Sequence, residues 1–325
     1  MLNIREIVRD AKRIGITGHE KPDGDCIGST LGLYNYIKKI VPEDTQVDIL
    51  LDELGDRYSY LKGFEAIDPE CGEREKYDVF FGLDSSTLDR YAGRRDYFEG
   101  AEKSVCIDHH ISNAGFGDLS YIDGEASSAS ELIFRLIPDE ELDRDIAICL
   151  YSGIISDSGV LQFSCTSPQT LRAAARLLEF DFDFPAIIER SYYEKTYVQN
   201  QILGRALIES VTFLDGRAIF SVVSRKMMDF YEAKSKDLDG IVNQLLHTRG
   251  VHCAIFLYET GDMQYKVSMR SDEWVDVAEI ALLHAGGGHV RAAGCTMQGN
   301  YYDVINSLSK SIEEAFDRYE KCITE

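Results

Sequence analysis

Val105-Cys106-Ile107-Asp108-His109-His110 places an acidic residue and two histidines directly after a short apolar run of the kind that forms a buried β-strand. The same arrangement occurs twice earlier, after Ile14-Gly15-Ile16-Thr17-Gly18 and after Val79-Phe80-Phe81-Gly82-Leu83. Because ligands bind beyond the carboxyl ends of the strands in an open parallel sheet, we expect the three polar clusters to meet at one place. Their residues are His19, Asp23, Asp25, Asp84, Asp108, His109 and His110.

The ligand types in these clusters predict a divalent metal, because carboxylates and imidazoles without thiolates suit manganese or magnesium better than a thiolate-bound zinc. Taken alone, the spacing of His19, Asp23 and Asp25 is explained equally well as a polar turn with Asp25 near a helix N-terminus. Asp157 ends an apolar helical pattern just before Gly159. By itself this is typical of an acid that caps a helix, but it also fits as a fourth ligand segment.

The first part of the chain alternates strand-like and helix-like segments, which predicts an α/β fold with a mainly parallel sheet. The expected strands are 14–18, 47–51, 77–83 and 104–107, and the expected helices are 27–40, 129–136, 143–155 and 167–178. Residues 184–210 are helical in pattern and form the candidate connector. Beyond them, Asp215-Gly216 predicts a hairpin between 211–214 and 217–223.

Further strands at 251–258 and 265–269 and a helix at 302–319 indicate a second, smaller α+β domain. We therefore expect a catalytic domain over residues 1–188, a helical linker over 189–210 and a substrate-binding domain over 211–325. A length of 325 residues is ample for two domains that each bury a core.

The amino-acid composition limits which classes of molecule this protein is expected to bind. The 34 basic and 56 acidic residues give a net charge of −22, which repels a long phosphate backbone, so we expect no long nucleic-acid duplex as a partner. No apolar stretch of about 20 residues and no signal-like N-terminus are found, which predicts a cytoplasmic protein without a membrane partner. The eight cysteines include no Cys-x-x-Cys pair, which argues against a zinc knuckle and a disulfide framework. The assembly state is left open, a homodimer included.

The order of the four polar segments resembles the four motifs of the DHH phosphoesterase superfamily. The glycine-rich run Gly286-Gly287-Gly288-His289, followed by Ala292-Ala293-Gly294, resembles the signature of the DHH-associated C-terminal domain. Ser268-Met269-Arg270-Ser271 resembles the substrate-contacting strand of that domain. The resemblance covers almost the whole chain. The superfamily includes the RecJ exonuclease, family II inorganic pyrophosphatases and small oligoribonucleases that also dephosphorylate adenosine 3′,5′-bisphosphate (pAp).

The resemblance implies roles for individual residues. One manganese ion would be held by His19, Asp23 and Asp84, and the other by Asp25, Asp84, His109 and Asp157, with Asp84 shared. His110 would meet the substrate phosphate, and Asp108 would orient the neighbouring imidazoles. Two ions that share the ligand Asp84 imply attack of a bridging hydroxide on phosphorus. The catalytic residues would be Asp84, Asp108 and His110.

The resemblance also implies a substrate pocket in the second domain. A glycine turn followed by a helix start would offer backbone N–H groups to a phosphate. The expected substrate-binding residues are His110, Arg270, Gly287, Gly288, His289 and Arg291. Arg249 and Lys266 are further candidates, although solvated charges at these two positions are the more common outcome.

The function that the resemblance implies is hydrolysis of very short RNA (nanoRNA) to mononucleotides and of pAp to AMP, with two Mn²⁺ or, as an alternative, Mg²⁺. The alternative substrates are cyclic di-AMP and its linear product pApA. An inorganic pyrophosphatase and a catalytically inactive nucleotide-binding module rank below them.

Overall fold

The computed structural model describes residues 2–70, 72 and 74–324, without the side chains of 322–324. It divides into two compact units, Met1–Glu194 and Lys195–Glu325. The segment 189–210, expected as a linker, is shared between them. A π-helical turn, η5 (Glu189–Tyr193), belongs to the first unit, and the helix α8 (Tyr197–Ile208) belongs to the second. The expected boundaries at 188 and 210 stay predictions.

The first unit is built on a six-stranded parallel sheet in the order β3-β2-β1-β4-β5-β6. Its strands are β1 (Arg13–Thr17), β2 (Gln46–Leu50), β3 (Ile67–Asp68), β4 (Val79–Leu83), β5 (Lys103–Asp108) and β6 (Leu119–Ile122). The expected parallel α/β fold is thereby confirmed. Because β1, β4 and β5 are adjacent, their carboxyl ends lie side by side at one edge of the sheet.

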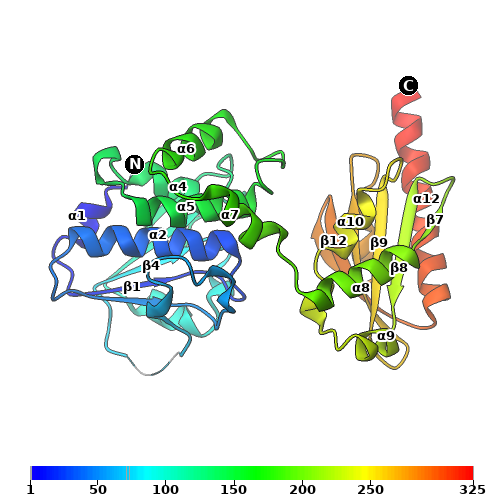
Figure 1. The fold of residues 1–325 in the computed structure, drawn as a ribbon, viewed down its shortest axis with the longest axis horizontal. Coiled ribbons are helices and arrows are strands. Elements are labelled where there is room, and N and C mark those ends of the chain that lie inside the picture. The colour runs from blue at the N-terminus through cyan, green and yellow to red at the C-terminus, as the bar shows by residue number, and fades with distance from the viewer. Residues whose placement is uncertain (1, 71, 73, 325) are drawn as a thin grey trace. The chain divides into compact units, whose positions relative to one another are not determined.

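Helices cover this sheet, as Figure 1 shows for α2, α4 and α5. The helices of the first unit are α1 (Ile4–Val8), α2 (Gly24–Ile40), α3 (Arg95–Gly100), α4 (Ala129–Leu136), α5 (Arg144–Asp157), α6 (Pro168–Leu178) and α7 (Phe184–Ile188). α2 packs directly against α5 and α4. The approach of α2 to α5 requires Gly28, because a Cβ there would lie 2.6 Å from the carbonyl oxygen of Cys149.

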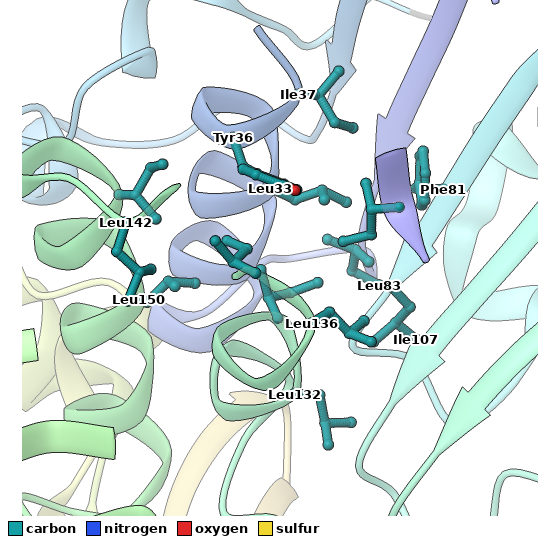
Figure 2. Packing of buried hydrophobic residues seen from close by; sticks show 14 of the residues in the cluster. Leu33, Tyr36, Ile37, Phe81, Leu83, Ile107, Leu132, Leu136, Leu142 and Leu150 are labelled. Atoms are coloured by element: carbon teal, nitrogen blue, oxygen red, sulfur yellow. The ribbon is translucent and has the colours of Figure 1, made fainter. Parts of the chain in front are cut away.

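The main core of the first unit lies between these helices and the sheet. Figure 2 shows Leu33 and Ile37 of α2 facing Phe81, Leu83 and the other side chains of the sheet. These apolar side chains are almost fully removed from water, and their burial is the main force that holds the strand ends in place.

The second unit is a mixed six-stranded sheet in the order β11-β12-β10-β9-β8-β7, parallel only between β8 and β9. Its strands are β7 (Val211–Phe213), β8 (Ala218–Val223), β9 (Cys253–Gly261), β10 (Gln264–Ser271), β11 (Gly287–His289) and β12 (Ala292–Gln298). Its remaining helices are α9 (Arg225–Phe230), α10 (Ile241–Leu246), α11 (Val277–Leu283) and α12 (Tyr301–Thr324). One apolar cluster joins the sheet to α11 and α12, and another joins it to α8 and α10. This is the smaller α+β unit that the sequence predicts.

Three local expectations are corrected. The glycine run does not lead into a helix, because Gly287–His289 is the edge strand β11 and the next segment is β12. The hairpin at Asp215-Gly216 has a longer turn, since Phe213 pairs with Ala218. The helical pattern of 184–210 is interrupted at Glu194, whose backbone is extended, and Thr196 starts α8 with a capping box.

Six of the eight cysteines are described with their side chains, and all six are free: Cys26, Cys106, Cys149, Cys165, Cys253 and Cys295. Cys71 and the side chain of Cys322 lie outside the described residues. Within the described ranges, every helix is too short or too polar to cross a membrane.

Candidate metal centre

The three polar clusters meet where β1, β4 and β5 end. His19 follows β1 after one glycine, Asp84 follows β4 directly, and Asp108 is the last residue of β5. Groups of their ligand atoms lie within 4.8 Å of one another. The convergence that the sequence predicts is therefore present in the structure.

His19 is held with one ring nitrogen turned toward the cluster. Its Nδ1 donates to the carbonyl oxygen of Glu20 at 2.8 Å, which leaves Nε2 as the nitrogen that faces the carboxylates. Nε2 lies 3.6 Å from an oxygen of Asp23 and 3.5 Å from Oδ2 of Asp84. Asp23 is also the N-cap of α2, because its Oδ1 accepts from the backbone N–H groups of Asp25 and Cys26.

Asp84 lies at the centre of the cluster and is 2% exposed. While its Oδ2 faces His19, its Oδ1 lies 3.3 Å from Nε2 of His109. The backbone at Asp84 has a φ of +50°, a left-handed conformation that is uncommon outside glycine. This conformation ends β4 and presents one oxygen to each imidazole.

His109 faces three carboxylates. Its Nε2 lies 3.3 Å from Asp84, 3.2 Å from Asp157 and 4.0 Å from Asp25. Nevertheless, this buried nitrogen makes no hydrogen bond to any residue that the structure describes. Asp157 is the last residue of α5, as expected from the sequence, and its carboxylate belongs to the ligand group formed with Asp25 and His109.

Asp25 is fully buried in the first turn of α2. Its two oxygens accept from the backbone N–H groups of Ala129 and Ser130, at 2.6 and 2.9 Å, where α4 begins. A helix N-terminus stabilises a carboxylate. Gly153 makes room for this contact, because a Cβ there would lie 2.8 Å from Asp25 and 1.9 Å from Ser130.

Asp108 and His110 form a second layer beside the cluster. Nδ1 of His110 donates to Oδ1 of Asp108 at 2.7 Å, and Asp108 is fully buried. The Nε2 atom of His110 is thereby the nitrogen left for another partner. The same Nδ1 lies 3.9 Å from Asp84, which places the imidazole next to the central carboxylate.

The pKa values of these groups reflect the mutual repulsion of several carboxylates held close together. Burial and the carboxylates of Asp84 and Asp157 raise the pKa of Asp25 well above its usual value. Burial likewise raises the pKa of Asp157 to about 6. For His109, burial alone would lower the pKa, but Asp157 and Asp84 raise it to about 12.

Cations fit this donor set. An unpartnered buried imidazole nitrogen surrounded by carboxylate oxygens is the environment that a divalent ion satisfies. The residues that would hold one ion are His19, Asp23 and Asp84, and those that would hold another are Asp25, Asp84, His109 and Asp157.

Among the expected substrate residues of the second unit, Arg270 lies on β10, and Gly287, Gly288 and His289 lie on β11, with β12 between these two strands. Arg270 of β10 pairs with Ala292 of β12, which pairs with His289 of β11, and residues directly opposite each other share one face of the sheet. Gly287 lies on that face as well, one pleat along from His289. Ala292, between Arg270 and His289, carries only a methyl group and is partly exposed.

Arg270 is half-buried, and its guanidinium forms no ion pair with any described residue; its Nη1 donates to the carbonyl oxygen of Met269 at 2.9 Å. Gly288 has a φ of +144°, and a Cβ there would lie 2.5 Å from the carbonyl oxygen of Ala292. Arg291 lies in the exposed turn between β11 and β12, and Lys266 and Arg249 are exposed.

Two residues of the centre were not predicted. Cys26 belongs to a ligand group with His19 and Asp84, although the sequence analysis assigned no site role to any cysteine. Asn113 donates to Asp108 from the loop after β5. The run Asn113-Ala114-Gly115 is a signal for an Asx turn, and this signal would have identified Asn113 as a structured loop residue.

Comparisons with known proteins agree with this geometry. The DHH family, N-terminal domain, matches residues 13–154, and the DHHA1 domain matches residues 215–324. A protein of Thermus thermophilus named as a bifunctional oligoribonuclease and PAP phosphatase NrnA is 31% identical over 88% of this chain and 84% of its own length. A Streptococcus mutans protein with the same name, marked probable, is 30% identical over 85% of this chain and 86% of its own length.

A solved structure is also similar over the whole chain. It is described as an exopolyphosphatase-related protein from Bacteroides fragilis, and it superimposes with a TM-score of 0.83 at 25% identity. The similarity covers 99% of this chain and 96% of the other.

Proposed function

Because the chain belongs to the DHH family and carries a DHHA1 domain after its DHH domain, we propose that this phosphoesterase cleaves very short RNA to mononucleotides and converts pAp to AMP. The names of the Streptococcus and Thermus relatives support both substrates. Their coverage supports the proposal as well, since the similarity extends through both units rather than through the metal centre alone.

The observation that carries the proposal is the division of the Asp84 carboxylate between His19 and His109. One oxygen faces each imidazole, at 3.5 and 3.3 Å. A shared carboxylate between two sets of ligands is what a centre for two ions requires. When bound, two such ions supply Lewis acidity and an activated water for in-line attack on phosphorus. Two Mn²⁺ suit the oxygen and imidazole ligands, with Mg²⁺ as the alternative.

His110 is the side chain placed to contact the substrate phosphate. Its Nδ1–H is held by Asp108, so the ring cannot turn away and Nε2 is left for a phosphoryl oxygen. In its doubly protonated form, His110 would donate from Nε2 to such an oxygen, and a donor fixed in advance stabilises charge that develops there without the cost of reorientation. Asp108 acts through His110, because its Oδ1 accepts from the ring nitrogen of that residue.

The second unit carries groups that can bind a phosphate. Arg270 has no carboxylate partner within the described ranges, and a guanidinium binds phosphate in a bidentate manner. His289 and Arg291 add donors next to Ala292 and Gly287. The net charge of −22 repels a long phosphate backbone, which favours short substrates.

The test is a parallel assay of the purified full chain with an RNA dinucleotide, pAp, cyclic di-AMP and pyrophosphate. We expect mononucleotides from the RNA and AMP from pAp in Mn²⁺, loss of both activities with a chelator, and recovery when Mn²⁺ is restored. A long RNA duplex should stay intact. Turnover of cyclic di-AMP or pyrophosphate alone would replace the proposed substrates, and absence of any turnover would indicate a binding module.

A further inference from the structure

Asn113 is a buried amide in the loop between β5 and β6, and it is 7% exposed. Its Nδ2 donates to Oδ2 of Asp108 at 2.8 Å and to the carbonyl oxygen of Ser85 at 2.9 Å. Its Oδ1 accepts from the backbone N–H of Gly115 at 2.7 Å. Both N–H groups and the carbonyl of this side chain are therefore used.

These partners fix which way the amide points. Asp108 and the Ser85 carbonyl can only accept, and the Gly115 N–H can only donate, so exchange of Oδ1 and Nδ2 would break all three hydrogen bonds. A buried amide that is turned the wrong way leaves polar atoms without hydrogen bonds, which destabilises that orientation. The orientation of Asn113 is thus determined by its surroundings.

The contact with Asp108 restrains His110. The carboxylate of Asp108 accepts from His110 with one oxygen and from Asn113 with the other. Rotation of a carboxylate about its terminal bond is otherwise soft. With a donor on each side, the carboxylate stays in one plane, and the His110 ring keeps its proton on Nδ1 and its Nε2 outward.

The contact with Ser85 extends this restraint to the metal centre. Ser85 follows Asp84, whose left-handed backbone turns the shared carboxylate toward both imidazoles. A single amide group therefore connects the end of β4, which carries Asp84, with the carboxylate at the end of β5 that orients His110. It fixes the distance between the shared metal ligand and the phosphate-binding imidazole.

We propose that Asn113 is a positioning residue for the hydrolysis, one that fixes His110 relative to Asp84 without contacting metal or substrate. This inference rests on the proposed function of the same site. It predicts a specific kinetic pattern, because a displaced His110 weakens contacts made in the transition state more than it weakens binding of the substrate.

Three variants test this role. Asn113→Ala removes the amide. Asn113→Asp keeps its size and its acceptor for Gly115 but points an oxygen at Asp108, and Asn35→Ala is the matched control. Asn35 is a partly buried amide of the same unit that donates to the carbonyl oxygens of Leu31 and Lys62, away from the centre. We expect both Asn113 variants to lower kcat for pAp about 10- to 100-fold, with KM and bound manganese unchanged.

A double-mutant cycle separates positioning from packing. In a His110→Ala background, Asn113→Ala should cause no further loss of kcat, because the group it positions is already gone. Wild-type kcat in Asn113→Asp, or a full additional loss in the His110→Ala background, would overturn the proposal.

A spectroscopic measurement keeps the proposal testable whatever the substrate is. In protein labelled with ¹⁵N-histidine and loaded with diamagnetic Mg²⁺, the ring nitrogens of His110 report which nitrogen carries the proton. We expect Nδ1–H in the wild type and a mixture of tautomers in Asn113→Ala. An unchanged tautomer in Asn113→Ala would overturn the positioning role, while failure of the hydrolysis assay alone would overturn only the proposed substrates.

Discussion

Oδ1 of Asp84 lies 3.3 Å from Nε2 of His109, a buried nitrogen that makes no hydrogen bond to any described residue. This pairing predicts that the metal centre loses at least one of its two ions when the charge at Asp84 is removed. Asp84→Asn should lower kcat by at least about 10²- to 10³-fold, the range seen when one preorganised electrostatic contact is lost, and should reduce bound manganese to one ion per chain or fewer. Metal analysis after gel filtration, together with kcat for pAp, measures both effects.

The control for that variant is Asp139→Asn, which removes an exposed carboxylate paired with Arg176 in the same unit. It should keep both ions and the activity. Circular dichroism should be the same for both variants. Two ions per chain and wild-type turnover in Asp84→Asn would contradict the shared role of this carboxylate.

Metal binding should release protons, and the pKa values give the sign. Burial alone would lower the pKa of His19, but Asp23 and Asp84 raise it to about 10, and the neighbouring carboxylates raise that of His109 to about 12. Both imidazoles are therefore charged at pH 7 in the metal-free protein, whereas a metal ligand must be neutral. Affinity for manganese should rise with pH by about tenfold per unit for each proton released.

Calorimetric titration with manganese in two buffers of different ionisation enthalpy measures this release directly. We expect a net release of protons near pH 7 and a smaller release in His109→Gln. The same shifts mean that the metal-free protein loses stability as pH rises toward 10 to 12, since the raised pKa values favour the protonated folded state below that range. An affinity independent of pH between 6 and 8 would contradict the proposed ligands.

Removal of the metal should destabilise the first unit. Asp25, Asp84 and Asp157 are gathered around one imidazole, and a bound cation offsets their repulsion. Saturation with manganese at a hundred times its Kd should add about 2.7 kcal/mol to the free energy of unfolding for each ion bound. Thermal melts in a chelator and at rising manganese concentrations measure the shift, and melts that coincide in both conditions would exclude a metal centre here.

The sequence predicted the convergence of the ligands because it depends on local patterns. Short apolar runs identify the parallel strands, and a parallel sheet brings the residues after β1, β4 and β5 together. His19, Asp84 and His109 needed no further information. Asp157 was ambiguous, since its helix end alone does not show which neighbours it faces.

Contacts between distant segments could not be read in this way. Asp25 is held by the start of α4, more than a hundred residues later in the sequence, and no local spacing indicates this pair. The glycine run became an edge strand because β12 pairs with it, a tertiary contact that overrides the local preference of glycine for turns. The contacts of Asn113 could not be predicted for the same reason, because this residue connects the ends of two strands that are distant in the sequence.

Glu131 should stabilise the helix start that holds Asp25. Its Oε2 accepts from Ser127 Oγ at 2.7 Å and from Thr170 Oγ1 at 2.8 Å, and the residue is fully buried. Burial alone would raise the pKa of Glu131, but these donors together with Arg135 lower it. Glu131→Gln should lower the free energy of unfolding by about 1–3 kcal/mol at pH 7, because it exchanges a charged acceptor for an amide that leaves donors unmatched.

The pH dependence of that loss follows from the lowered pKa. The stabilisation by Glu131 is present above its unfolded pKa of about 4.3 and disappears as pH falls through the folded value. Urea unfolding of the wild type and Glu131→Gln should therefore differ less at pH 3.5 than at pH 7. Glu140→Gln, an exposed glutamate in the same unit, is the control and should follow the wild type at both values. A constant difference would show that the charge of Glu131 does not contribute.

Arg270 should govern substrate binding rather than the chemical step. It is half-buried on β10, and burial lowers the pKa of its guanidinium, so its positive charge is kept at some cost in the free protein. An anion on the surface shared with His289 would repay that cost. Arg270→Ala should raise KM for an RNA dinucleotide about tenfold or more with kcat nearly unchanged, and Arg270→Lys should recover only part because it loses the bidentate contact.

The matched control is Arg205→Ala, which removes an exposed arginine of the same unit that is already paired with Glu209. It should leave KM and kcat at wild-type values. If Arg270→Ala lowered kcat at saturating substrate while KM stayed constant, Arg270 would contact the reacting phosphate instead. An unchanged KM and kcat would place the substrate pocket elsewhere, because no other guanidinium lies on the strand register that Arg270 shares with Ala292 and His289.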